Sequence, residues 1–338
     1  MKKKYYWWLL LVLVIFLIVL GFLYFKDNDS YKHKSANEIK TVKIGILNVP
    51  NDVAVVRSNG SLNKALKKYG YRAKFIVFDS GVDANKALMS GSIDMATMGD
   101  TNAVIALDKH IPVKLVWVND VIEKNEALIV KNNSHINSLN ALSGHMVATP
   151  FACTSQYSLE TVLNLHHIKK VKLMDMDTQD IVSAWERGDI KAAYTWEPTL
   201  SQLKKDGHVL ISSKTLHNEG YLTANVTLMR NQFITEHHKV ALAIINCLSK
   251  MHRDYNSNLH KSKIYADAAK QVDIPISTAK TMMSESQYPS IKKEKQFNNK
   301  IFPRSLLLIT KFLIKNQAIN RNLSNRQITH FLNIDLIK

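Results

Sequence analysis

The sequence has little of what builds disulfide scaffolds or metal centres. Its 338 residues include two cysteines, Cys153 and Cys247, which allow one disulfide or two free thiols. The histidine pairs His166-His167 and His237-His238 consist of adjacent residues, so the two rings of each pair point to different faces of a helix. Neither pair has the spacing of metal ligands. We therefore expect no metal and no other cofactor.

The sequence also lacks the motifs of several enzyme and nucleic-acid-binding classes. It contains no G-x-S-x-G motif, no glycine-rich phosphate loop, no RNP motif and no zinc finger. Internal repeats and low-complexity tracts are absent, and a composition of 46% hydrophobic and 22% charged residues is typical of a globular protein. These absences favour a protein that is neither an enzyme nor a partner of nucleic acid.

Positive charge is in excess but is spread along the chain. The formal net charge is +17, and residues 1–40 hold seven lysines against three acidic residues, which leaves +13 for the other 298 residues. Because no long run of lysine and arginine occurs there, we interpret this charge as a solvated surface. A basic surface of this kind suits a position next to an anionic membrane.

The N-terminus has the pattern of a membrane anchor. Lys2-Lys3-Lys4 precedes Tyr5–Phe25, a stretch of 21 uncharged residues that as a helix spans roughly 30 Å of hydrocarbon. The lysines and the aromatic residues at its start predict a cytoplasmic N-terminus and an extracytoplasmic remainder. The stretch is longer than the apolar region of a signal peptide, and no A-x-A-like cleavage site follows it. We favour an uncleaved anchor at residues 1–25 with a tether at 26–40; a cleaved signal is the alternative.

From Val42 onward, short apolar strands alternate with helical patterns. The first run contains expected strands at 42–47, 75–78, 93–98 and 113–118. A second run contains expected strands at 126–130, 145–149, 171–174, 190–195 and 208–211. After Ala224–Arg230, which alternates as a strand, the pattern is wholly helical. This order predicts two doubly wound α/β lobes followed by a helical tail that covers the first lobe.

We place the crossings between the lobes near Glu126 and near Ala224. Lobe 1 then comprises residues 41–124 and 231–338, and lobe 2 comprises residues 125–230 with the hinge crossings. In lobe 1, an expected strand is followed in each case by a polar loop, at 48–52, 79–81 and 99–102. Ligands of doubly wound sheets lie beyond the carboxyl ends of strands, so we expect these loops on one binding edge.

The stretch Thr149–Glu160 is the strongest candidate for an anion site. Pro150 ends the strand before it, and a helical pattern begins near Thr154 or Ser155. A helix N-terminus offers unpaired backbone N–H groups and the positive end of the helix dipole, and small hydroxyl side chains add donors. An ordinary helix cap is the alternative interpretation.

Five segments give the chain a family resemblance. They are KIGI near the start, FDSG at Phe78–Gly81, EALIVK at Glu126–Lys131, PFACTSQYSLE, and SAWERGDIKAAYTWEP at Ser183–Pro198. Together, from about Val42 to Phe233, they resemble the taurine- and aliphatic-sulfonate-binding proteins of bacterial ABC importers. The resemblance implies the type II periplasmic binding protein fold, in which a hinge joins two lobes. It also implies that the protein closes on a small sulfonate and presents it to a permease and, through it, to the ATPase subunit. We expect it to act as a monomer.

The resemblance also assigns ligand contacts to this chain. Hydroxyl and loop residues are expected at the sulfonate end, and carboxylates, an amide and an indole around the rest of the ligand. The first group is Gly81, Asp100, Thr101, Thr154 and Ser155, and the second is Glu126, Trp196, Glu197 and Asn225. Considered without the resemblance, Trp196 suits a core position and Glu126 an exposed strand end.

Three positions depart from the family pattern. Asn225 stands where similar sequences carry an aspartate suited to an ammonium group, and Asp100 stands where they carry a small hydroxyl residue. An amide supplies no charge, and a charge-assisted hydrogen bond is about twice as strong as a neutral one. We therefore hypothesise that the amine contact is weakened or moved, to Asp100 or Glu197, which makes a sulfonate without an amine a candidate ligand. The third departure is Cys153, where similar sequences have serine.

The sequence leaves other functions open. The same fold could bind nitrate, a thiamine-precursor pyrimidine or another small metabolite, or could serve as a tethered sensory module without transport. Nitrate would need neither the wall formed by Trp196 nor the carboxylates. An enzyme is the least favoured function, because the expected cleft residues are hydroxyls, amides and carboxylates without a paired base.

Overall fold

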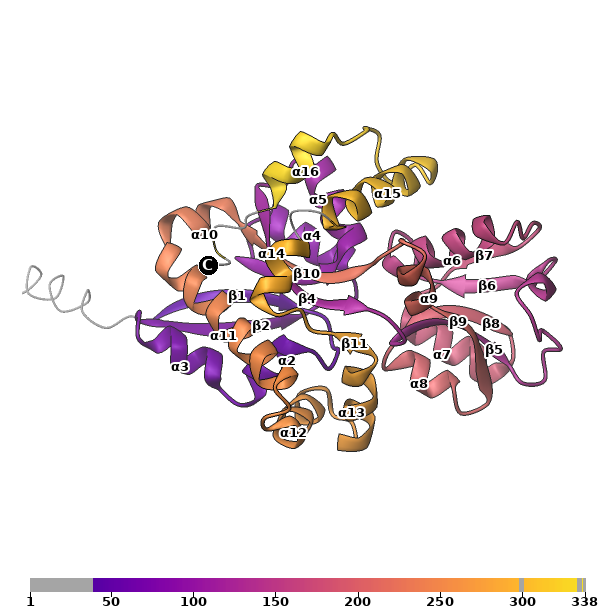
Figure 1. The fold of residues 1–338 in the computed structure, drawn as a ribbon, viewed down its shortest axis with the longest axis horizontal. Coiled ribbons are helices and arrows are strands. Elements are labelled where there is room, and N and C mark those ends of the chain that lie inside the picture. Colours follow the sequence, from indigo (N-terminus) through magenta and orange to yellow (C-terminus); the bar gives the residue numbers. More distant parts are fainter. Residues whose placement is uncertain (1–38, 298–300, 333–335, 337–338) are drawn as a thin grey trace, which may run out of the picture. The chain divides into compact units, whose positions relative to one another are not determined.

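The computed structural model describes residues 39–297, 301–332 and 336 (Figure 1). The expected membrane anchor at residues 1–25 lies outside the described residues, as does the expected tether up to residue 38. Within the described ranges, no helix combines the length and the apolar character that crossing a bilayer requires. The chain from Val42 onward forms one compact unit.

The first of two sheets has six strands. Their spatial order is β11 (Ser286–Gln287), β4 (Val113–Ile122), β10 (Ala224–Arg230), β3 (Met95–Gly99), β1 (Lys40–Ile46) and β2 (Tyr71–Val77). β1 pairs with β3 in parallel, whereas β10 runs antiparallel to β3 and to β4. The strand that returns from the second half of the chain therefore lies in the middle of this sheet.

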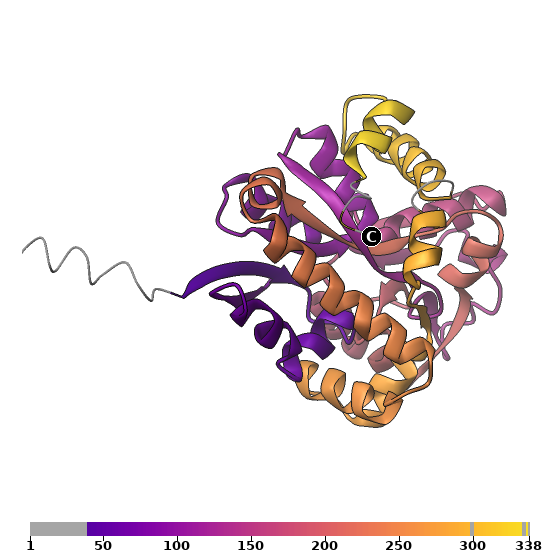
Figure 2. The ribbon, with the colours of Figure 1, turned by 60° about the vertical axis from the view of Figure 1, so that its left-hand side comes forward.

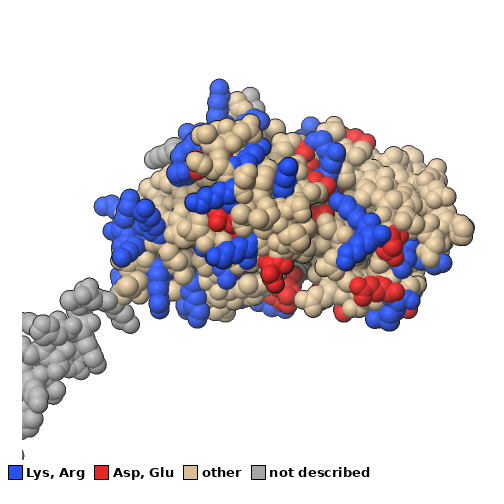
Figure 3. Space-filling view, turned by 90° about the horizontal axis from the view of Figure 1, so that it is seen from below, with Lys and Arg blue, Asp and Glu red and all other residues tan. Residues whose placement is uncertain are grey.

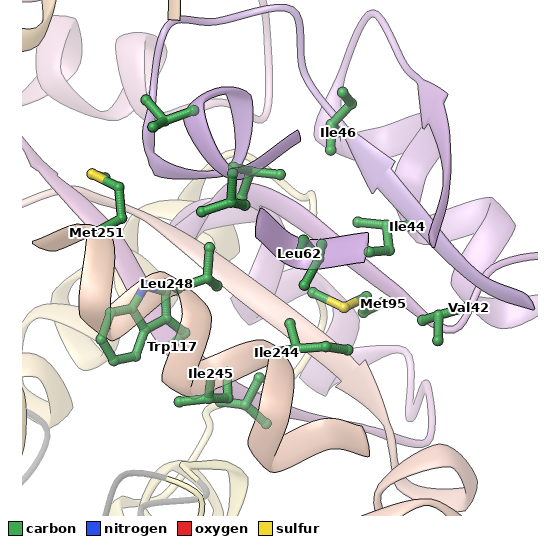
Figure 4. Close-up of a cluster of buried hydrophobic side chains, with 14 of the residues drawn as sticks. Val42, Ile44, Ile46, Leu62, Met95, Trp117, Ile244, Ile245, Leu248 and Met251 are labelled. Carbon is green, nitrogen blue, oxygen red and sulfur yellow. The ribbon is translucent and has the colours of Figure 1, made fainter. Parts of the chain in front are cut away.

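Helices cover both faces of the first sheet, because its buried side chains alternate between the faces. Val42, Ile44 and Trp117 point to one face, where they pack against Ile244 and Leu248 (Figure 4). The helices on this face are α2 (Asp52–Ser58), α3 (Ser61–Lys67), α10 (Asn231–Glu236), α11 (His238–Asn256), α12 (Lys261–Val272) and α13 (Ile276–Ser284). The long orange helix in Figure 2 is α11, which lies along the sheet.

The opposite face of the first sheet has its own core. It contains Leu115, Val118 and Leu228 from the strands. The helices that pack there are α4 (Gly81–Met89), α5 (Asp100–Asp108), α15 (Phe302–Lys315) and α16 (Asn325–Phe331). A further short helix, α14 (Ile291–Gln296), carries Glu294, whose buried carboxylate accepts a hydrogen bond from the N–H of Val118 at 2.6 Å. The helical tail thus covers the first lobe, as the sequence predicts, and it packs on both faces of the sheet.

The second sheet has five strands. Their order is β7 (Lys172–Asp175), β6 (Met146–Thr149), β8 (Ala192–Trp196), β5 (Glu126–Lys131) and β9 (Gly207–Ser212). One face packs against α6 (Thr154–Leu165) and α9 (Ser213–Asn218), and the other against α7 (Thr178–Arg187) and α8 (Thr199–Leu203). The predicted α/β architecture of two lobes is confirmed.

The two crossings between the lobes lie side by side. The N–H of Ile122 donates to the carbonyl oxygen of Thr223 at 3.0 Å, and the ammonium of Lys214 lies 2.7 Å from the carboxylate of Glu123. Paired crossings of this kind form a hinge about which two lobes can rotate. Sheet membership places β10 with the first lobe, so the return crossing ends a few residues before the boundary expected at 230.

A buried polar cluster joins the C-terminal helices to the start of α2. The carboxylate of Asp52 accepts hydrogen bonds from Trp117 at 3.0 Å and from Asn119 at 2.9 Å, and lies 3.1 Å from Nε2 of His252. The other ring nitrogen of His252 lies 2.8 Å from the carbonyl oxygen of Pro289. Because Asp52 and His252 are both buried, this pair holds α11 and the segment after β11 in place beside the first sheet.

Several predicted boundaries are wrong. The loop expected at 48–52 runs into α2, which the sequence interpretation missed, and the loop expected at 99–102 is mostly the first turn of α5. The strand expected at 113–118 continues to Ile122.

The surface carries basic side chains in excess. On the face shown in Figure 3, lysine and arginine are more numerous than aspartate and glutamate and are spread across the surface. This distribution agrees with the interpretation of the net charge as a solvated surface.

A candidate ligand-binding cavity between the two lobes

A small cavity lies between the two lobes, with a volume of about 60 Å³. Residues from both sheets and from the helical tail line it: Leu47, Val49, Pro50, Asn51, Ser80, Gly81, Gly99, Asn102, Asp120, Ile122, Asn125, Glu126, Cys153, Thr154, Trp196, Glu197, Asn225, Met282, Ser286 and Tyr288. We call this the inner cavity. A wider outer cavity of about 300 Å³ adjoins it and shares Leu47, Val49 and Trp196 with it. The indole of Trp196 therefore stands at the boundary between the two.

Four helices begin at the inner cavity. The residues that precede or open α2, α4, α5 and α6 all line it, namely Asn51, Ser80, Gly81, Gly99, Cys153 and Thr154. Asn51 and Ser80 cap their own helices through side-chain hydrogen bonds, but Gly99 and Cys153 make no such bond. The residue before α5 and the residue before α6 thus leave the helix N-terminus without their own side-chain cap, which suits an anion, although in α5 the first N–H groups also lie near the carboxylate of Asp100.

Glycine permits the lobes to approach closely at this point. A Cβ atom on Gly99 would lie 2.9 Å from Cγ2 of Thr154 in the other lobe, and one on Gly81 would lie 2.4 Å from Oδ1 of Asn102. Across the same gap, the amide of Asn102 donates to the carbonyl oxygen of Ala152 at 3.2 Å. The absence of a side chain at Gly99 therefore lets α5 and α6 of the two lobes meet, and its absence at Gly81 lets α4 and α5 pack closely within the first lobe.

Three carboxylates line the inner cavity, while its lining among the described residues includes no lysine, arginine or histidine. Glu126 accepts hydrogen bonds from three hydroxyls, those of Thr154 at 2.5 Å, Ser213 at 2.7 Å and Ser158 at 3.2 Å. Burial raises the pKa of Glu126, and these hydroxyl donors lower it in part. The carboxylate of Glu126 therefore already accepts hydrogen bonds from hydroxyl groups of its own lobe.

Glu197, the second carboxylate, is already paired with a cation. Its oxygens accept from the N–H of Ser201 at 2.9 Å and from the ammonium of Lys204 at 3.2 Å. Lys204 also lies 3.5 Å from Glu285, at the end of α13 in the first lobe. Lys204 thus links an acidic residue of each lobe beside the cavity.

The third carboxylate, Asp120, lies opposite Asn225 on the neighbouring strand. The amide nitrogen of Asn225 donates to both carboxylate oxygens, at 3.2 and 3.1 Å. Asp120 is 2% exposed. Burial, followed by the nearby charge of Asp52, raises the pKa of Asp120 to about 7. The hydrogen bond from Asn225, the charge of His252 and the hydrogen bond from Ser286 act in the opposite direction.

Six of the nine expected ligand contacts line the inner cavity. They are Gly81, Glu126, Thr154, Trp196, Glu197 and Asn225. The hydroxyl of Thr154 was expected to donate to the anion, but it donates to Glu126. What α6 offers to an anion is thus its backbone N–H groups rather than this side chain.

The other three expected contacts lie behind the cavity wall. Ser155 is fully buried and accepts from Thr149 at 2.9 Å, and the buried hydroxyl of Thr101 has no hydrogen-bond partner. Asp100 accepts from the N–H of Ala224 at 2.9 Å, and burial raises its pKa well above the usual range. These three side chains do not line the cavity and are buried in the first turns of α5 and α6.

Sequence reasoning missed four polar residues of the lining. They are Asp120 in β4, Asn125 just before β5, Ser286 in β11 and Tyr288 after it. The only signal in the sequence was the polar pair Asn119-Asp120, which follows an apolar strand. The two cysteines are free thiols, and burial raises the pKa of the Cys153 thiol to about 12, so it stays protonated beside the cavity.

Comparison with protein families assigns the chain to a family of substrate-binding domains. The model of the substrate binding domain of the ABC-type glycine betaine transport system matches residues 40–271. The chain belongs to this family. This family of substrate-binding domains is not a family of enzymes, and its match covers the first lobe up to α12 and the whole second lobe.

Individual bacterial binding proteins are similar to this chain. The taurine-binding periplasmic protein of Escherichia coli is 31% identical over 198 residues, which are 58% of this chain and 61% of that protein. A putative aliphatic sulfonates-binding protein of Bacillus subtilis is 24% identical over 219 residues, 63% of this chain and 64% of that protein. The alignments thus span somewhat less than two thirds of these curated relatives.

Solved structures share the fold over a longer range. The crystal structure of the periplasmic aliphatic sulphonate binding protein from Escherichia coli matches 86% of this chain and 92% of that chain, with a TM-score of 0.69 and 18% identity. At this identity the likeness concerns the fold. It agrees with two sheets flanked by helices and with a periplasmic binding protein architecture.

Proposed function

We propose that this chain is the solute-binding component of an ABC importer and that it holds taurine or a related alkanesulfonate in the inner cavity. The observation that supports this most directly is the meeting of four helix N-termini, from both lobes, at one small cavity. Uncapped N–H groups and helix dipoles stabilise an oxyanion without a basic side chain. Inorganic anions fit less well, because three carboxylates share the cavity.

In this proposal each lobe supplies part of the sulfonate site. The N–H groups that open α5, next to Gly99, would hold it from lobe 1, and those that open α6, next to Thr154, from lobe 2. The indole of Trp196 would cover the apolar carbons of the ligand. Because both lobes contact the ligand, it binds the closed form more tightly than the open form and shifts the population toward closure. The permease would recognise the closed form.

We also propose that the chain works at the outer surface of the cell membrane. The uncharged stretch Tyr5–Phe25 would anchor it there, and residues 26–40 would tether the binding domain close to its permease. A tether of 15 residues reaches at most roughly 50 Å. The protein would act as a monomer that docks on the permease and, through it, couples to the ATPase subunit.

A thermal-shift screen of the full chain in mild detergent tests the proposed ligand class. The panel contains taurine, ethanesulfonate, longer alkanesulfonates, sulfate, nitrate and glycine betaine. A sulfonate at 100 times its Kd should stabilise the protein by about 2.7 kcal/mol, and sulfate and nitrate should produce no shift. Stabilisation by nitrate or glycine betaine, with none by any sulfonate, would overturn the proposal. Copurification of permease subunits would separate an importer from a sensory module.

A further inference from the structure

The three carboxylates of the inner cavity differ in what they already bind. Glu126 has three hydroxyl donors, and Glu197 has the ammonium of Lys204 together with a backbone N–H. Asp120 has neutral donors alone, the amide of Asn225 at 3.1 and 3.2 Å and the hydroxyl of Ser286. Among these three cavity carboxylates, Asp120 is thus the one whose charge is compensated neither by a cation nor by a set of three donors.

The charged groups around Asp120 compensate it only in part, because the charge of Asp52 raises its pKa and that of His252 lowers it. On the side of α2 and α11, Asp52 and His252 lie 3.1 Å apart and form a pair with each other. On the side of the tail stands Tyr288, whose ring packs edge-on against His252 with 5.3 Å between centroids. β10 contributes Asn225 and β11 contributes Ser286, both neutral. Among the described residues, the buried carboxylate of Asp120 therefore has no cation in direct contact, and one that enters the cavity would supply it.

The sheet places Asp120 at a defined distance from the anion end of the cavity. Asn225 is the register partner of Asp120 on one side and of Gly99 on the other. Gly99 and Asp120 are therefore two strand spacings apart at the same level of the sheet, roughly 10 Å. A two-carbon aminosulfonate with a hydrogen bond of about 2.9 Å at each end covers a similar span.

We propose that Asp120 binds the ammonium group of the ligand, so that the inner cavity selects sulfonates that carry an amine. This inference rests on the proposed function and narrows its substrate class. The amide of Asn225, which donates to both oxygens of Asp120, then positions this carboxylate, and the carboxylate contacts the ammonium group. The sequence had suggested Asp100 or Glu197 for this role, but Asp100 lies behind the wall and Glu197 is already paired with Lys204.

Calorimetric titration of the full chain with taurine and with ethanesulfonate, which differ only by the amine, tests the assignment. The wild type should prefer taurine by about 10- to 100-fold, the range expected for one charged hydrogen-bonding contact. Asp120→Asn should bring this preference to within about threefold and leave the affinity for ethanesulfonate unchanged or improved. Glu294→Gln, which alters a buried carboxyl bonded to the same strand outside the cavity, is the matched control and should keep the wild-type preference.

The outcomes separate the two proposals. If ethanesulfonate binds but the wild type shows no preference for taurine, or if Asp120→Asn keeps the preference, the assignment of Asp120 is wrong and the sulfonate function stands. Loss of the preference in Asp100→Asn or Glu197→Gln instead of Asp120→Asn would also overturn it. If no sulfonate binds the wild type, both proposals fail. Cooperative melting of Asp120→Asn at or above the wild-type temperature shows that its binding data refer to a folded protein.

Discussion

Gly99 and Thr154 face each other across the inner cavity at a distance that leaves no room for a side chain on Gly99. An added Cβ atom would lie 2.9 Å from Cγ2 of Thr154. Gly99 belongs to the first lobe and Thr154 opens α6 of the second, so their contact limits how closely the lobes approach. At this point the N-termini of α5 and α6 meet.

Gly99→Ala should weaken ligand binding by about tenfold or more, because overpacking at this contact costs about 1–3 kcal/mol in the closed form. The backbone angle φ of Gly99 is −65°, which alanine adopts without strain, so the free energy of unfolding should change little. The double variant Gly99→Ala/Thr154→Ser removes the colliding methyl group, keeps the hydroxyl that bonds Glu126, and should recover most of the affinity. Calorimetry with the same sulfonate measures all three proteins; equal affinities would contradict the steric role.

His252→Ala should lower the free energy of unfolding by about 3 kcal/mol or more, because it leaves Asp52 buried without its partner. The two side chains are 1% and 0% exposed and lie 3.1 Å apart. His238→Ala, at an exposed position of the same helix, is the matched control and should stay within about 0.5 kcal/mol of the wild type. Urea denaturation followed by circular dichroism provides both values, and a similar small effect of the two substitutions would contradict the prediction.

Ser213→Ala should destabilise the protein by about 1–2 kcal/mol, because the hydroxyl donates to the buried carboxylate of Glu126 at 2.7 Å. Ser213 lies outside the lining of the inner cavity, so the affinity for a sulfonate should change less than the stability. Ser183→Ala removes an exposed hydroxyl that bonds its own helix and should have almost no effect. Parallel urea and binding titrations compare the two. A loss of affinity without loss of stability would indicate that Ser213 acts on the ligand instead.

Asp120→Asn should stabilise the unliganded protein above neutral pH. The pKa of Asp120 is raised from 3.8 to about 7 in the fold, so its ionisation disfavours the folded state. The resulting penalty is absent below pH 4, grows between pH 4 and 7, and reaches at most about 4 kcal/mol above pH 7.

The free energy of unfolding gained by Asp120→Asn should grow over the same pH range, from pH 4 to pH 7. Urea denaturation at pH 4.5, 6 and 8 measures this gain as the difference between the variant and the wild type. Other acids that titrate in this range cancel in the difference, because both proteins contain them. The charged groups nearest to the site, Asp52 and His252, are likewise present in both. A gain that is equal at all three pH values would show that packing, rather than ionisation, causes it.

Local patterns predict most of the fold. Strand and helix alternation, glycine and proline positions and the polar loops predict both lobes, because hydrophobic periodicity reports which face of each element is buried. The helix α2 escaped prediction because its run of valines and alanine, Val53–Val56, favours a strand locally. Its burial against α12 and the Asn51 cap outweigh that preference.

The candidate site is predictable where it depends on local sequence. The start of α6 and the glycines that precede α4 and α5 follow from helix and turn patterns. Asp120 was not predictable, because its position depends on the register between β4 and β10, strands that are separated by the whole second lobe. Pairing over such a distance leaves no periodic signal in the sequence. The same long-range register places Asn225 between Asp120 and Gly99.

The lining of the inner cavity, which among the described residues holds carboxylates and helix N-termini but no basic side chain, also determines which solutes compete for it. Sulfate and phosphate offer the same tetrahedral oxygens as a sulfonate, but they carry more negative charge and no cation to set against the carboxylates. Such a binding protein would keep its capacity in surroundings where inorganic oxyanions greatly outnumber organic sulfonates. Its selectivity would then rest on electrostatic exclusion more than on the shape of the cavity.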